Sequence, residues 1–96
     1  MKIDFSQNDG VLQIAPDGRL DTTTAPELER FLHNNLQNEQ ALIINCEKLI
    51  YISSAGLRVL LAAQKKTKGA MKLTGVGELV MEVLEMTGFA DILTIE

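Results

Sequence analysis

Two adjacent serines are the residues of this 96-residue chain whose type and position best suit chemistry. Ser53 and Ser54 stand where a helix is predicted to begin, and the small residues Ala55 and Gly56 follow them. The simplest interpretation is an N-cap, in which a serine hydroxyl accepts a hydrogen bond from a free backbone N–H. The position also suits a phosphoryl acceptor, because free N–H groups and the positive end of the helix dipole stabilise a phosphate. The small residues would let another protein's active site approach the hydroxyl.

Asp21 is the charged residue that we expect beside this serine pair. Ligands and partners of an open α/β sheet bind at the carboxyl ends of its parallel strands. The end of the strand predicted at 42–46 and the segment 20–24 should both point to that edge. A phosphate would add about −1.5 to −2 charges next to Asp21, so phosphorylation there would act as a repulsive switch.

Other residues with reactive side chains lack the spacing of a catalytic arrangement. His33 lies in the middle of a predicted helix with no nucleophile placed near it, and Cys46 ends an apolar strand, where a free cysteine is usually inert. Segment 75–77 lacks the Lys-Ser/Thr of a P-loop and the third glycine of a dinucleotide-binding fingerprint, so a tight strand-to-helix turn explains it better. The glutamates of segment 78–85 are spaced by four and three, which is typical of a solvated helix face. We therefore predict that the chain is not an enzyme.

The composition excludes several classes of partner. The chain has 9 Lys and Arg against 13 Asp and Glu, and this net charge of −4 argues against binding to nucleic acids or anionic membranes. One cysteine cannot form an internal disulfide, and one histidine cannot build a His-rich metal site. Residues 1–5 include an acid where a secretory signal would be apolar, and no segment approaches the roughly 20 apolar residues of a membrane span. We expect a cytoplasmic protein without membrane insertion, cofactor or metal.

The hydrophobic pattern and the turn residues predict strands and helices in the order β-β-α-β-α-β-α-β. The strands are expected at 3–6, 11–15, 41–46, 70–74 and 92–95. The second strand is interrupted by a break or bulge at 16–18 and can resume at 19–20. The first helix is expected to begin after a threonine cap at Thr22, Thr23 or Thr24 and to end near Asn38. The second begins at the serine pair and ends near Gly69. The third has a buried face of Leu79, Val80, Val83 and Leu84 and ends near Gly88.

This order predicts one compact α/β domain over residues 1–96. Its sheet is mixed and mostly parallel, with an N-terminal antiparallel hairpin closed by the turn at 8–10 and with the first strand at one edge. About three main helices are available. They should cover one face of the sheet and leave the other thin or open.

Four stretches of the chain resemble the STAS domains, the family of bacterial anti-sigma-factor antagonists. Segment 51–57, Tyr-Ile-Ser-Ser-Ala-Gly-Leu, resembles the signature of the family. Segments 18–21, 42–45 and 86–89 resemble the family's Gly-x-Leu-Asp, central strand and end of the last conserved helix, in the same order and spacing. The likeness extends from residue 3 to residue 95 and implies a STAS-like fold.

The resemblance also implies a function. An antagonist of this family binds a serine-kinase anti-sigma factor when unphosphorylated, is inactivated when the kinase phosphorylates one serine, and is restored by a serine phosphatase. In the family motif Asp-Ser-(Ser/Thr)-Gly-Leu the acceptor follows the aspartate. Anchored on Gly56 and Leu57, that acceptor is Ser54, while Ser53 stands in place of the aspartate and Ala55 in place of the second hydroxyl. Ser53 is the second candidate for phosphorylation.

We expect a monomer whose partners are that kinase and phosphatase. Arg58 would help to hold a phosphate only if it turned back toward the serine. The missing aspartate favours a competing hypothesis, a STAS interaction subunit without a phosphorylation cycle in a lipid-transport ABC assembly or a chemosensory complex. A nucleotide-binding protein is a third hypothesis. The expected partner-binding residues are Asp21, Thr22, Thr23, Ser53, Ser54, Ala55 and Gly56.

Overall fold

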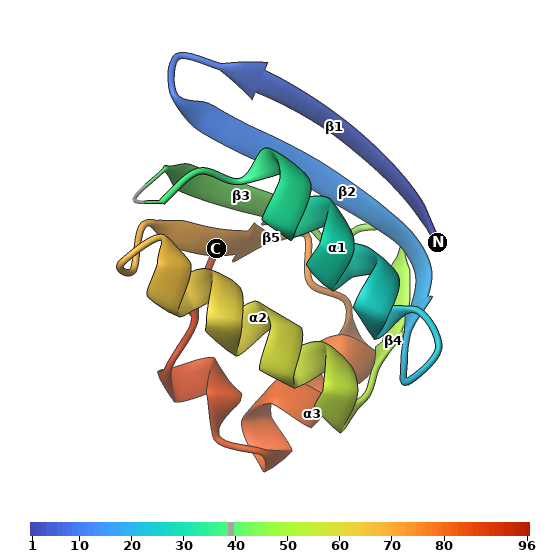
Figure 1. Cartoon of the computed structure of the whole chain (residues 1–96). Helices are drawn as coiled ribbons and strands as arrows, with labels where there is room; N and C mark the ends of the chain where they lie inside the picture. Colours follow the sequence, from blue (N-terminus) through green and yellow to red (C-terminus); the bar gives the residue numbers. More distant parts are fainter. Residues whose placement is uncertain (39) are drawn as a thin grey trace.

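The computed structural model describes residues 1–38 and 40–96, which form a sheet with helices packed mainly on one side (Figure 1). The strands are β1 (Lys2–Asn8), β2 (Val11–Leu20), β3 (Ala41–Asn45), β4 (Leu49–Ile52), β5 (Met71–Thr74) and β6 (Thr94–Ile95). The helices are α1 (Ala25–Asn35), α2 (Ser54–Lys66) and α3 (Glu78–Met86), followed by the short 3-10 helix η1 (Phe89–Asp91). The predicted class, a mixed sheet with an N-terminal hairpin and three main helices, is confirmed.

The long strand β2 organises the sheet. It pairs with β1 in an antiparallel ladder across a turn in which Asp9 and Gly10 both have positive φ, as the sequence 8–10 predicts. The first half of β2 pairs with β3 in a parallel ladder, and its last residues pair with β4. The sheet continues from β3 to β5 and β6. The carboxyl ends of β2 and β4 therefore lie side by side.

Strand β4 was absent from the predicted order. It has only four residues, and residues 47–48 before it give no strong turn signal, so the sequence favoured a connection between β3 and α2. The irregularity expected at 16–18 is a bulge in the pairing of β2 with β4 rather than a break. Leu49 pairs with Gly18 and Tyr51 pairs with Arg19, which leaves Ile50 as the extra residue on β4.

The core lies between the sheet and the helices. Alternate residues of the central strands are buried against α1 and α2, and these are Leu12, Ile14, Leu42, Ile44, Met71 and Leu73. Their neighbours Gln13, Ile43 and Lys72 point to the other face and are exposed or half-buried. Figure 1 shows α1 and α2 side by side over the front of the sheet, with α3 in orange below them. This agrees with the prediction of one covered and one open face.

Three predicted boundaries or faces were wrong. Helix α1 ends at Asn35 rather than near Asn38. The last strand contains only Thr94 and Ile95, because the chain first forms η1 and then buries Leu93. Leu79 was expected in the buried face of the third helix but is 66% exposed, since α3 buries only the side that carries Val80 and Leu84.

Candidate functional site

The candidate site lies where β2 and β4 end. Leu20 and Ile52 are paired at the ends of these strands, and the backbone N–H of Ser53 donates to the carbonyl oxygen of Leu20 at 2.9 Å. Asp21 and Ser53 therefore follow two adjacent strand ends, as the sequence led us to expect. The expected contribution from the end of β3 was wrong. Ile44 pairs with Ile14, far back along β2, and β4 takes the place beside the site.

The two serines differ in their surroundings. Ser53 is the N-cap of α2 and is half-buried, and its Oγ accepts a long hydrogen bond of 3.5 Å from the backbone N–H of Gly56. Ser54 is the first residue of α2 and is exposed. Its hydroxyl forms no hydrogen bond with any other residue between 1–38 or 40–96. The N-cap interpretation thus describes Ser53, and the exposed serine of the pair is Ser54.

Gly56 brings the first turn of α2 close to the sheet. A Cβ at this position would lie 2.8 Å from Cγ of Leu20 and 2.9 Å from Cγ1 of Ile52, closer than carbon atoms normally approach. Only glycine fits this contact without displacement. Gly56 is buried, so it lies beneath the surface that Ser54 and the half-buried Ala55 form.

The Asp21 carboxylate organises the loop before α1. It accepts hydrogen bonds from the backbone N–H groups of Thr23 at 3.0 Å and Thr24 at 3.1 Å. The bond from Thr24 is the main cause that holds the pKa of Asp21 below its ordinary value; the other bonds and the nearby Arg19 guanidinium act in the same direction and outweigh desolvation. Asp21 is therefore a carboxylate at neutral pH.

The threonines before α1 agree with the prediction in part. Thr24 occupies the N-cap position of α1, but its hydroxyl donates to the carbonyl oxygen of Arg19 at 2.6 Å and makes no capping bond. The prediction that one of these threonines is the N-cap is confirmed at Thr24, although the first turn of α1 bonds to the backbone carbonyl oxygen of Thr24 and not to its hydroxyl. Thr22 and Thr23 are exposed on the loop beside the site.

Sequence reasoning missed a contact between Arg19 and Tyr51. The two residues are paired across β2 and β4, and the guanidinium carbon of Arg19 lies 4.3 Å from the centre of the Tyr51 ring. Nε of Arg19 is also 3.8 Å from Oδ2 of Asp21. This arrangement holds a cation against the acidic loop. Recognition of β4 as a strand would have revealed the pairing.

A shallow groove adjoins the site between the first turns of α1 and α2. Its volume is about 280 Å³, and Thr22, Pro26, Ala55 and Arg58 are among the residues that line it. The Arg58 side chain is exposed and makes no ion pair or hydrogen bond with another residue in the described part of the chain. It therefore forms no hydrogen bond with Ser54 in this conformation.

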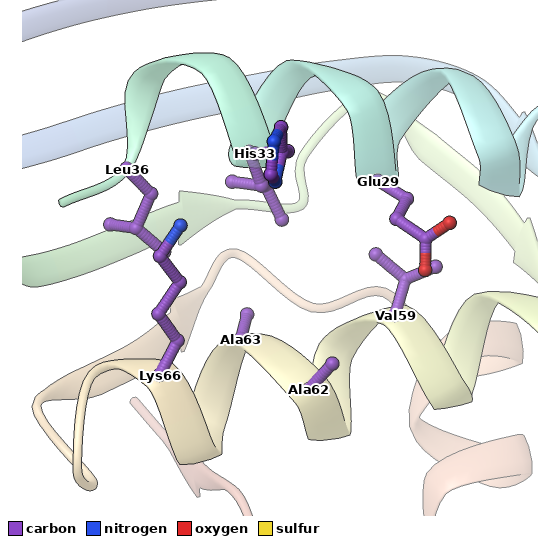
Figure 2. A pocket seen from close by; sticks show the side chains of 8 residues that line it. Glu29, His33, Leu36, Val59, Ala62, Ala63 and Lys66 are labelled. Carbon is purple, nitrogen blue, oxygen red and sulfur yellow. The ribbon is translucent and has the colours of Figure 1, made fainter. Parts of the chain in front are cut away.

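The residues that could suggest catalysis lie elsewhere. His33 lines a second groove of about 170 Å³ between α1 and α2, where Figure 2 shows it on the α1 side with Glu29, facing Val59 and Lys66 of α2. None of the residues that line this groove carries a hydroxyl or thiol nucleophile. Cys46 is buried, and burial raises the pKa of its thiol to about 12, so the thiolate does not form at neutral pH.

The comparison with known sequences identifies the family. The profile of the STAS domain matches residues 2–96. The chain belongs to the STAS domain family. This STAS domain is 33% identical over 96 residues to BtrV of Bordetella bronchiseptica, which is named as a candidate anti-sigma factor antagonist; the match covers 96% of this chain and 83% of BtrV. It is 29% identical to the anti-sigma-B factor antagonist of Bacillus subtilis, over 99% of this chain and 90% of the relative.

Solved structures agree on the fold. An anti-sigma factor antagonist from Mycobacterium paratuberculosis superposes with a TM-score of 0.83 at 23% identity, over 98% of this STAS domain and 85% of that chain. The antagonist SpoIIAA in its unphosphorylated form gives a TM-score of 0.78 at 14% identity, over 99% and 88%. In the described residues, no helix has the length and apolar character that crossing a membrane requires.

Proposed function

We propose that this STAS domain is an anti-sigma-factor antagonist that works as a phospho-switch. The unphosphorylated form binds a serine-kinase anti-sigma factor in the cytoplasm, phosphorylation of Ser54 blocks binding, and a serine phosphatase restores it. The names of its relatives support the class of partner. The observation that carries the proposal is the exposed Ser54 hydroxyl at the start of α2, where the ends of β2 and β4 meet.

The chemistry is supplied by the partner. Oγ of Ser54 attacks the γ-phosphorus of ATP, the bond from that phosphorus to the β,γ-bridging oxygen breaks, and ADP leaves. The hydroxyl proton passes to a base of the kinase. This STAS domain contributes an accessible hydroxyl, and the small side chain of the half-buried Ala55 beside it keeps the approach open.

The surroundings of the two serines favour Ser54 as the acceptor. The Ser53 hydroxyl is half-buried and accepts the capping bond from Gly56, so modification there would disturb the start of α2. The Ser54 hydroxyl points into solvent at a helix N-terminus, where backbone N–H groups and the helix dipole stabilise a phosphate. A phosphate on Ser54 therefore leaves the fold intact.

Local charge explains how the phosphate would block binding. The phosphate adds about −1.5 to −2 charges to a surface that already holds the ionised Asp21 carboxylate. A kinase surface that fits the unphosphorylated form then meets a group with a different charge and larger volume at the centre of the contact. Like charges or an unmatched phosphate at an interface cost several kcal/mol.

A phosphorylation assay tests the proposal. The chain is incubated with ATP and each purified serine-kinase anti-sigma factor of the source organism, and the modified residue is mapped by mass spectrometry. We expect one phosphate on Ser54, lost in Ser54→Ala and retained in the matched variant Ser53→Ala. Modification of Ser53 or of another residue, or no modification by a kinase that binds the chain, would contradict the assignment.

A second candidate function is an interaction subunit without a phosphorylation cycle. Ser53 in place of the family's aspartate favours it. In that case the chain would copurify with an ABC transporter or a chemosensory complex and carry no phosphate on either serine. Genes for a kinase and a phosphatase beside its own would favour the switch instead.

A further inference from the structure

Several exposed apolar side chains lie on elements of the domain that contact one another. In the part of the chain that the structure describes, the large apolar residues that are more than half exposed are Phe5 (55%), Ile50 (58%), Leu79 (66%), Met86 (79%) and Ile92 (51%). The ring of Phe5 packs edge-on against Phe31, with the ring centres 4.9 Å apart. The other four lie on β4, on α3 and just after η1. Because α3 packs against both β4 and η1, these segments adjoin one another.

Helix α3 is more apolar than its contact with the domain requires. Val80 and Leu84 are buried, whereas Leu79 and Met86 are exposed. Leu79 and Met86 are seven residues apart, two turns of a helix, so they lie on the same side of α3. A surface helix normally carries polar residues where it meets water. The exposed side of α3 is therefore suited to contact another molecule.

Ile50 extends this surface toward the candidate switch. It is the extra residue of the bulge in β4, and a bulge redirects a side chain that regular pairing would place elsewhere. The strand continues for two residues after Ile50 and reaches Ser53 at the start of α2. We call Ile50, Leu79 and Met86 the α3 patch. It lies on the structural elements that adjoin the candidate site.

The charges around the α3 patch indicate what would cover it. Helix α3 carries Glu78, Glu82 and Glu85 and contains no Lys or Arg. Glu82 lies one turn from both Leu79 and Met86, so the apolar side chains are bordered by carboxylates. A matching surface is apolar in the middle and has Lys or Arg at its border.

We propose that the α3 patch is a second docking surface for the anti-sigma factor. The anti-sigma factor contacts the α3 patch with an apolar area of its own that is bordered by Lys and Arg. The identity of this partner rests on the proposed function. The α3 patch is separate from the hydroxyl of Ser54, so its contribution to affinity does not depend on the phosphate.

Binding measurements with surface variants test the α3 patch. The probe is the purified serine-kinase anti-sigma factor of the source organism that binds the unmodified chain in calorimetry. The double variant Leu79→Gln with Met86→Gln changes only exposed side chains, so its Tm should stay unchanged while its Kd rises about tenfold or more. Glu82→Lys should weaken binding and reduce its salt dependence. Asp4→Lys makes the same charge change on exposed β1 and should leave Kd unchanged.

The outcomes separate the α3 patch from the switch. If Ser54→Asp weakens binding and the double variant does not, the docking proposal for the α3 patch is wrong and the proposed function stands. If the double variant weakens binding and Ser54→Asp does not, the proposed phospho-switch at Ser54 is wrong and the docking proposal for the α3 patch stands. If the double variant changes only the sedimentation of the chain alone, the patch covers a second copy and the proposal is wrong. If no anti-sigma factor binds the unmodified chain, both proposals fail.

Discussion

Gly56 is the position where one added methyl group tests how closely α2 packs on the sheet. Helix propensity alone predicts that Gly56→Ala stabilises the domain, because alanine is favoured over glycine inside a helix by about 1 kcal/mol. The structure predicts the opposite sign. The new Cβ would lie 2.8 Å from Cγ of Leu20 and 2.9 Å from Cγ1 of Ile52. Carbon atoms in contact prefer about 3.5–4.0 Å, so the groups must move apart by more than half an ångström.

Neither neighbour can move cheaply. Leu20 is 0% exposed and Ile52 is 1% exposed, so both are enclosed by the core. Overpacking of this kind costs about 1–3 kcal/mol, which exceeds the gain in helix propensity and leaves a net loss of about 1 kcal/mol. For a domain of this size, a loss of about 1 kcal/mol lowers Tm by roughly 4–8 °C.

Thermal unfolding followed by circular dichroism measures this effect. The control is Gly77→Ser, which adds a Cβ in open space at the N-cap of α3, where serine is a preferred residue. Its Tm should stay the same or rise slightly. A Tm of Gly56→Ala above that of the unmodified chain would refute the packing of α2 described above.

Further predictions concern single side chains of the site and the core. Asp21→Asn should lower Tm at neutral pH. Because folding lowers the pKa of Asp21, the contribution of its carboxylate to stability is present above about pH 4 and disappears as pH falls further. The Tm values of the variant and of the unmodified chain should therefore converge in acid. Equal Tm values at neutral pH would contradict the role of the carboxylate. The buried Cys46 thiol, with its pKa of about 12, should resist iodoacetamide in the native protein at neutral pH and react in denaturant. Rapid native labelling detected by mass spectrometry would show that the segment directly after β3 is not packed as described.

Much of the fold followed from turn residues and periodicity. Asn8, Asp9 and Gly10 mark the hairpin turn, and the apolar periodicity of α1 and α2 places both helices against one face of the sheet. Strand β4 was not predicted because its four residues, which include a bulge, do not alternate between apolar and polar side chains. The exposure of Leu79 was also not predicted, because periodicity finds an apolar side of a helix but does not tell whether the domain or a partner covers it.

The site was predicted in part. Asp21 and the serine pair were expected near each other from the rule on strand ends, and they follow the paired residues Leu20 and Ile52. The strand beside β2 at that edge is β4 instead of β3. The hydrogen bonds of the Asp21 carboxylate to the loop before α1 and the contact of Arg19 with Tyr51 depend on loop geometry and strand register, which residue types alone do not determine.

The affinity of the two phosphorylation states for one anti-sigma factor tests the central proposal most directly. The chain is prepared unmodified and fully phosphorylated on Ser54, and both forms are titrated into the same purified kinase by calorimetry without ATP. The switch predicts binding of the unmodified form and a Kd about 100-fold or more higher for the phosphorylated form. Equal affinity of the two forms would contradict it.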